Sequence, residues 1–131
     1  MPRGILLIEH DEIQGPIIKT SFFLKETKVP KDFVSKLYMS HASFDNISSI
    51  EMKMTQFKIV SCFTGSLDRK SGKEGILAFI LDENEEFSNL PLFLKRNVHR
   101  AIDNPHVKYL KKIVMVRFPN YCNLMDMLDK T

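Results

Sequence analysis

The amino-acid sequence predicts an α+β fold in which a mainly antiparallel sheet carries helices on its faces. Two short runs, Ile5 to Ile8 and Ile76 to Leu81, are apolar throughout, which is typical of central strands covered on both sides. Other stretches repeat apolar residues at helical spacing. The order is strand, strand, helix, three strands and then helices. No change of composition divides residues 1–131, so we expect a single domain.

The first quarter of the chain predicts a β-hairpin followed by a helix. "GILLIEHD" and "IIKTSFFLK" flank a turn containing Gly15 and Pro16, so the hairpin extends from about residue 4 to residue 25. After "ETKVPK", Asp32 stands where a helix N-cap is expected. Helical spacing then continues to about Phe44 and is carried by Phe33, Val34, Leu37 and Tyr38, and His41 also fits this spacing.

The third quarter predicts a meander of three strands. "SSIEMKMT" alternates, with Ile50, Met52 and Met54 on one face and Glu51 and Lys53 on the other, as expected of a half-buried strand at the edge of a sheet. "FKIVSCFTGSL" and "GILAFIL" supply the other two strands. Residues 68–75 form their connection.

The last third predicts helices. Asp82 or Asn84 can cap the first of these, with Glu85 and Glu86 in its first turn, and Pro91 either kinks this helix or marks its true first turn. Its apolar stripe consists of Leu90, Phe93, Leu94, Val98, Ala101 and Ile102. "DNP" at 103–105 ends it. Residues 107–128 read as a last helical region broken near Pro119, although "KIVMVRF" also has strand propensity.

Composition favours a reduced, cytoplasmic protein. Cys62 and Cys122 lie in apolar-leaning segments without disulfide or metal-site spacing, so we expect buried thiols. The first apolar run meets four polar residues at 9–12, and no stretch approaches the roughly 18 apolar residues of a membrane span. We therefore expect neither a targeting segment nor a span, and a cytoplasmic location that can be peripheral to membranes.

No motif predicts catalysis, a cofactor or a metal site. In "LDRKSGKEGILAFIL" the spacing from Gly65 to Gly72 is too long for a phosphate-binding loop, Lys73 is followed by Glu74, and a strand follows where that loop requires a helix. A flexible hairpin loop is the simpler interpretation. His10, Asp11 and Glu12 alternate between the faces of a strand, and the other histidines lack metal-ligand spacing with either cysteine.

Basic residues crowd the last third of the chain. They could bind anionic lipid headgroups, although a solvated helix face is the simpler interpretation. Nucleic acid is not expected, because aromatic residues are not interleaved as stacking platforms. The candidate contacts to an anionic surface are Lys95, Arg96, Arg100, Lys108, Lys111 and Lys112.

Three stretches give the chain a resemblance to longin domains, and more narrowly to the N-terminal longin domains of nitrogen permease regulator-like, folliculin and DENN-type proteins. They are "LIEHDEIQGPII", "VPKDFVSKLY" and "MTQFKIVSCFTGSLDRKSGKEGILAFIL", and the resemblance extends over about residues 4–81. The C-terminal helices match in type only. Profilin and roadblock folds share the layered sheet but typically begin with a helix, and a profilin-like actin binder is a weaker alternative.

The resemblance implies a longin, profilin-like layered fold whose five-stranded antiparallel sheet has its first and fifth strands together at the centre. It also implies a non-catalytic adaptor that dimerises with a longin or roadblock domain, or with a second copy. Such an adaptor binds small GTPases or membrane-trafficking complexes.

In the regulator-like and folliculin groups, the loop before the fifth strand carries an arginine that projects into a GTPase. The position that matches best here is Lys73, with Arg69 and Lys70 in the same loop. An ammonium is a compact point charge, whereas a guanidinium is a rigid fork suited to phosphate oxygens. The resemblance therefore implies GTPase binding by this loop, with a GTPase-activating role as the alternative.

Overall fold

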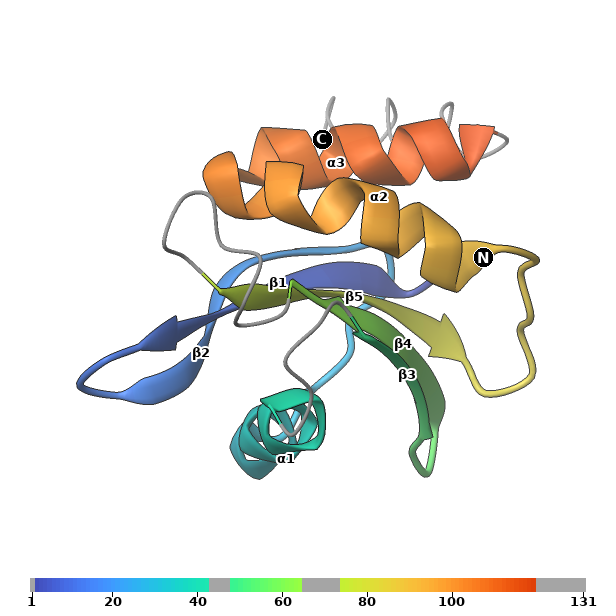
Figure 1. Cartoon of the computed structure of the whole chain (residues 1–131). Helices are drawn as coiled ribbons and strands as arrows, with labels where there is room; N and C mark the ends of the chain where they lie inside the picture. Colours follow the sequence, from blue (N-terminus) through green and yellow to red (C-terminus); the bar gives the residue numbers. More distant parts are fainter. Residues whose placement is uncertain (1, 43–47, 65–73, 120–131) are drawn as a thin grey trace.

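The computed structural model describes residues 2–42, 48–64 and 74–119. Five strands form one antiparallel open sheet in the order β2-β1-β5-β4-β3, and three helices cover it (Figure 1). The strands are β1 (Gly4–Asp11), β2 (Gly15–Phe23), β3 (Ser48–Lys53), β4 (Phe57–Phe63) and β5 (Gly75–Asp82). The helices are α1 (Lys31–Ala42), α2 (Leu90–Asp103) and α3 (Val107–Arg117). The predicted class and order of elements are confirmed.

The two continuous apolar runs lie side by side at the centre of the sheet, as predicted. β1 and β5 pair antiparallel, with Leu6 opposite Ala78 and Ile8 opposite Ile76. All four of these side chains are fully buried. A strand buried on both faces needs no polar side in its sequence, which is why these runs lack one.

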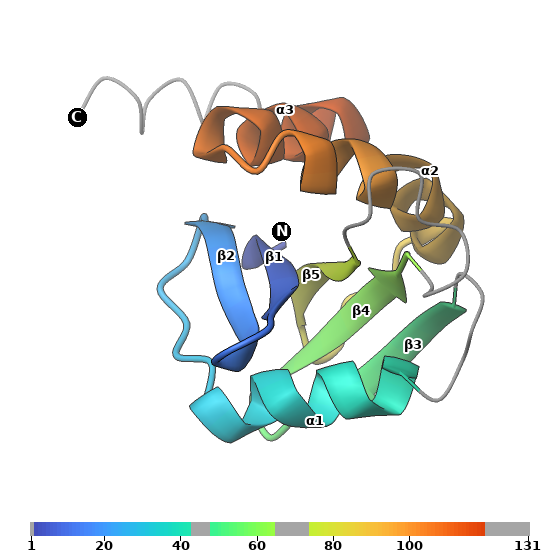
Figure 2. The same cartoon turned by 60° about the vertical axis from the view of Figure 1, so that its left-hand side comes forward.

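Helices cover both faces of the sheet. α2 and α3 lie together over one face and α1 over the other (Figures 1 and 2). Alternate residues of the central strands divide between the two layers: Ile5 and Leu7 join the core under α2 and α3, whereas Leu6 and Ile8 join the core over α1. The faces of the central strands are thereby occupied, and the edges of the sheet and the outer helix surfaces are left for contacts.

The first hairpin forms as predicted, but its turn consists of residues 12–14, and Gly15 and Pro16 are the first two residues of β2. The Asp11 carboxylate accepts hydrogen bonds from the backbone N–H groups of Ile13 (2.7 Å) and Gln14 (2.9 Å), and these bonds lower its pKa. Gly15 follows with φ +80°, a conformation that suits glycine.

The start of α2 differs from the prediction. The helix begins at Leu90, so Glu85 and Glu86 precede it, and Pro91 lies in its first turn and does not kink it. The Glu85 carboxylate instead accepts a hydrogen bond from the Asp82 backbone N–H (2.8 Å), which closes a separate turn. The residue at the N-cap position is Asn89, in the left-handed conformation with φ 60°, and not Asp82 or Asn84.

The other helix boundaries lie close to the predicted ones. α1 begins one residue before Asp32, which occupies its first turn and is not its cap. α3 is a helix throughout "KIVMVR", so tertiary packing overrides the strand propensity of that segment. The predicted helical region beyond residue 119 lies outside the described residues.

Candidate functional site

The sheet presents two edges, β2 and β3, and they differ in how well another strand could join them. β2 contains Pro16, which has no N–H to donate, and its register with β1 shifts at Lys19, which has no opposite residue. The Thr20 hydroxyl also donates a hydrogen bond to the Pro105 carbonyl oxygen (2.8 Å), which ties β2 to the start of α3. Prolines, bulges and covering segments are the features that protect sheet edges, so β2 is a poor site for a further strand.

The β3 edge is regular and exposed. Within the described chain β3 pairs with β4 alone, and the register from Ser48↔Phe63 to Lys53↔Lys58 is unbroken. As predicted, β3 alternates: Met52 packs against the core between the sheet and α1, whereas Glu51 and Lys53 are exposed. Figure 2 shows β3 at the rim, opposite β2. β3 is therefore the candidate pairing edge.

Lys53 faces a second lysine, Lys58, directly across the β3–β4 pair. Like charges in directly opposite positions destabilise an antiparallel pair. Lys58 has an ionic partner in Glu51, with 3.4 Å between Nζ and Oε1, whereas Lys53 has none among the residues that the structure describes. An additional acidic group beside Lys53 would therefore stabilise this edge.

The predicted GTPase-contacting residues, Arg69, Lys70 and Lys73, lie outside the described residues. The base of their loop, which consists of Thr64 and Gly75, is described, and hydrogen bonds join its two residues. The Thr64 N–H donates to the Gly75 carbonyl oxygen (3.0 Å), and the Gly75 N–H donates to the Thr64 hydroxyl (3.2 Å). The loop therefore begins and ends at one fixed point of the sheet.

A polar and aromatic cluster adjoins this base. The Tyr38 hydroxyl of α1 donates a hydrogen bond to the Glu74 carboxylate, and the rings of His10 and Tyr38 stack at 5.2 Å between centroids. α1 is thus joined to the start of β5 beside the loop.

His41 and Cys62, two groups with potential chemistry, are both withdrawn from solvent. His41 is fully buried with Nε2 2.7 Å from the Ser61 hydroxyl oxygen, and burial lowers its pKa to about 4. Burial raises the pKa of the free Cys62 thiol to about 11. The prediction of a buried thiol is confirmed for Cys62, whereas Cys122 lies outside the described residues. Both described groups serve the core.

The basic residues predicted to contact an anionic surface lie on the helical layer formed by α2 and α3. Five of them are exposed, namely Lys95, Arg96, Arg100, Lys108 and Lys112. Lys111 is partly buried, with its ammonium 5.4 Å from the centroid of the Phe22 ring. Lys108, Lys111 and Lys112 line one shallow hollow with Met115 and Val116, while Arg96 lines another.

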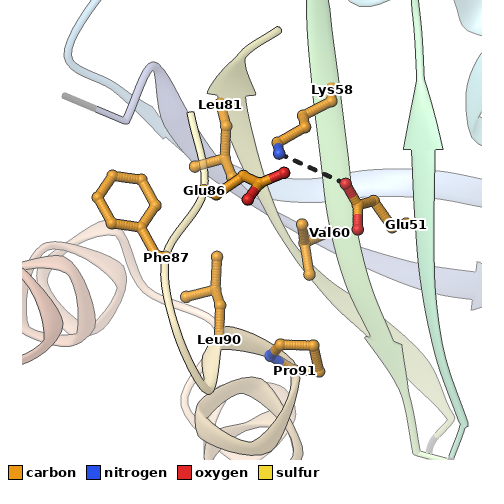
Figure 3. A pocket seen from close by; sticks show the side chains of 8 residues that line it. All are labelled: Glu51, Lys58, Val60, Leu81, Glu86, Phe87, Leu90 and Pro91. Carbon is orange, nitrogen blue, oxygen red and sulfur yellow. Dashed lines mark ion pairs between the residues drawn. The ribbon is translucent and has the colours of Figure 1, made fainter. Parts of the chain in front are cut away.

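Sequence reasoning missed one group, Lys58. It lies in β4, whose seven residues are all buried, and its side chain is 4% exposed. The only sign in the sequence is a charged residue within the apolar run "FKIVSCF". The lysine lines a pocket between β3, β4, β5 and the segment that leads into α2 (Figure 3).

Comparisons of the chain with models of protein families, with curated proteins and with solved structures find no match. No group of three or more His, Cys, Asp or Glu side chains able to hold a metal ion occurs among residues 2–42, 48–64 and 74–119. In the same part of the chain, none of the helices combines the length and apolar character needed to cross a membrane.

Proposed function

We propose that this chain is a longin-type adaptor that works by contact, not by catalysis. It pairs through β3 with a second domain of the same architecture and binds a small GTPase or a membrane-trafficking complex in the cytoplasm. The observation that carries this proposal is the open β3 edge on a sheet whose faces are covered by helices. The central position of β1 and β5, which the longin resemblance implies, supports the same assignment.

The charges of β3 suit pairing with a second copy. Antiparallel pairing about a two-fold axis at Met52 sets Glu51 of each copy opposite Lys53 of the other. Each Lys53 then gains an acidic neighbour, which offsets its unfavourable position across from Lys58. Met52 meets its own copy, and Ile50 meets Met54. The edge is self-complementary in both charge and apolar character.

The GTPase-binding part of the proposal relies on the loop between β4 and β5. Its fixed base at Thr64 and Gly75 gives the loop a defined origin beside Tyr38 and His10. The roles of Arg69, Lys70 and Lys73 stay predictions.

Two measurements test this function. Sedimentation velocity across a range of concentrations should show a dimer, and capture on the immobilised chain should retain small GTPases of its host. A chain that stays strictly monomeric and retains none of those GTPases would contradict the adaptor function.

A second candidate function is supported by the distribution of charge. Residues 90–117 contain seven of the 19 Lys and Arg but only one of the 16 Asp and Glu, Asp103. This segment therefore carries +6 and the rest of the chain −3, since the total is +3. Met115, which is partly exposed, and Val116, which is 65% exposed, accompany the lysines of α3. A basic surface with apolar side chains suits peripheral contact with anionic membranes.

A further inference from the structure

The pocket around Lys58 has the features of a binding site for a small ligand. It has a volume of about 270 Å³ and lies at the β3 side of the sheet, under the segment that joins β5 to α2 (Figure 3). Pockets for drug-sized ligands span roughly 300–1,000 Å³, so this one suits a smaller molecule. Two carboxylates, one ammonium and an apolar wall line it.

Lys58 is the central polar group of this pocket. Its side chain is 96% buried, and within the described chain its one ionic partner is Glu51. The distance of 3.4 Å between Lys58 Nζ and Glu51 Oε1 exceeds the roughly 2.7–2.9 Å of a charge-assisted hydrogen bond. An ammonium has three donors. Lys58 therefore retains donors for an anionic group in the pocket.

Glu86 supplies charge from the other side of the pocket. Its carboxylate points toward the space in which Lys58 and Glu51 meet, yet no ion pair joins Glu86 to Lys58 in the part of the chain that the structure describes (Figure 3). With two carboxylates and one ammonium, the pocket carries a net charge of −1. A ligand that brings only an anion would take the net charge to −2, whereas a ligand that brings both an anion and a cation leaves it at −1 and gives Glu86 an ionic partner.

The remaining lining is apolar and comes from three elements and a connecting segment. Val60 belongs to β4, Leu81 to β5, and Leu90 and Pro91 to the first turn of α2, while Phe87 precedes that helix. Val60, Leu81 and Leu90 are buried residues of the core. Such a wall suits an aliphatic side chain a few carbons long.

We propose that this pocket binds a small zwitterion with an aliphatic side chain, of the class of the apolar α-amino acids. The ligand carboxylate accepts hydrogen bonds from Lys58, the ligand ammonium donates to Glu86, and the aliphatic group contacts Val60, Leu81 and Leu90. The site lies apart from the loop between β4 and β5, and the proposal does not depend on the adaptor function.

A purely structural role for Lys58 makes a different prediction. In that role the Lys58–Glu51 pair only ties β3 to β4, and a methionine of similar length would fill the same space without the cost of burying a charge. Measurements of ligand binding separate the two roles, because the structural role predicts no binding.

The experiment titrates the intact chain with L-leucine and follows methyl and amide NMR shifts. The comparison ligands are 4-methylpentanoate, which lacks the ammonium, and 3-methylbutylamine, which lacks the carboxylate. We expect saturable shifts at the pocket with L-leucine and at least about tenfold weaker binding of each comparison ligand, because each loses one charge-assisted contact.

Variants of the lining residues test which side chains contact the ligand. Lys58→Met and Glu86→Gln should each weaken L-leucine binding at least about tenfold, whereas Glu83→Gln, which removes a charge at an exposed position of the same segment outside the pocket lining, should not alter it. Glu86 is exposed, so Glu86→Gln tests the site even if Lys58→Met fails to fold. Absence of shifts at millimolar L-leucine would overturn the proposal. Equal binding of either comparison ligand, or unchanged binding by Glu86→Gln, would also overturn it.

Discussion

At the scale of single residues, burial decides what His41 can do. Its ring is fully removed from solvent at the junction of α1 and β4, where Nε2 lies 2.7 Å from the Ser61 hydroxyl oxygen. Burial disfavours the charged imidazolium, so the pKa falls from 6.5 to about 4. The sequence showed a histidine at the end of a helical stripe but did not indicate that a serine of β4 would meet it.

This pKa shift predicts a pH-dependent stability. The neutral form of His41 is favoured in the folded chain, so its contribution is full above pH 6.5 and is lost as the pH falls from 6.5 toward 4. The total loss is on the order of 3 kcal/mol in the free energy of unfolding. Chemical denaturation at a series of pH values measures it. The stability that Asp11 contributes through its lowered pKa is lost as the pH falls through 3.8, at the acid end of this window and below it.

Two variants isolate the His41 contribution. His41→Asn should reduce the slope of stability against pH between 6.5 and 4, whereas His106→Asn, at an exposed position, should leave the slope unchanged. Equal slopes for the wild type and His41→Asn would contradict the burial effect.

Gly75 shows a second constraint at the residue scale. A Cβ at this position would lie 2.5 Å from the Ile8 carbonyl oxygen and 3.0 Å from Ile102 Cδ1. Because the first of these atoms belongs to the backbone of β1, the pairing of β1 with β5 must shift to admit a methyl group. We expect Gly75→Ala to lower the free energy of unfolding by about 1–3 kcal/mol in urea denaturation. Glu83→Ala is the control, and a loss no larger than that of the control would contradict this packing.

At the scale of elements, the two edge strands have opposite properties. β2 is protected by Pro16, by the extra residue Lys19 and by its tie to Pro105, whereas β3 continues in regular register to its last residue. The alternation of β3 was enough to predict an edge strand. The sequence did not show which edge stays open, because that depends on how α3 packs beside β2.

The charge pattern of β3 predicts the effect of one substitution on pairing. Lys53→Glu would set acidic residues opposite each other in the two-fold pair, so we expect dimerisation to weaken at least about tenfold in sedimentation velocity. Within one chain the new carboxylate faces Lys58, so the fold should not lose stability. Lys28→Glu makes the same charge change at an exposed position outside β3. A dimer that tolerates Lys53→Glu as well as Lys28→Glu would contradict pairing through β3.

The start of α2 illustrates what local sequence cannot decide. Asp82, Glu85 and Glu86 carry the composition of a helix N-terminus, and their position before an apolar stripe predicted one there. In the structure β5 continues to Asp82, and the segment after it turns and reaches α2 only at Leu90. Pro91, which fits the first turn of a helix, was the correct signal.

At the scale of the whole molecule, the fold separates charge. The layer of α2 and α3 carries the excess of positive charge, while the remainder of the chain is net acidic. Lys108 and Lys112 are exposed one helical turn apart on α3, beside the partly exposed Met115. If this layer meets anionic membranes, it should do so through that surface.

Vesicle binding tests this surface. We expect vesicles containing phosphatidylserine to bind the chain at low salt and to release it as salt rises. The double variant Lys108→Glu and Lys112→Glu should weaken binding at least about tenfold, since each lysine near the surface contributes about 1 kcal/mol. Lys25→Glu with Lys28→Glu makes the same change of charge away from the helices. No vesicle binding at low salt would end this candidate function.

The sequence by itself determined the element order, the central position of β1 and β5 and the edge position of β3. Each of these follows from the pattern of apolar and polar residues within a short stretch, and that pattern can be read from the sequence alone. Only the tertiary structure decided the open edge, the burial of His41 and the pocket of Lys58, Glu51 and Glu86. These features bring together residues that are distant in sequence. The distances between those residues in space depend on how the helices pack on the sheet.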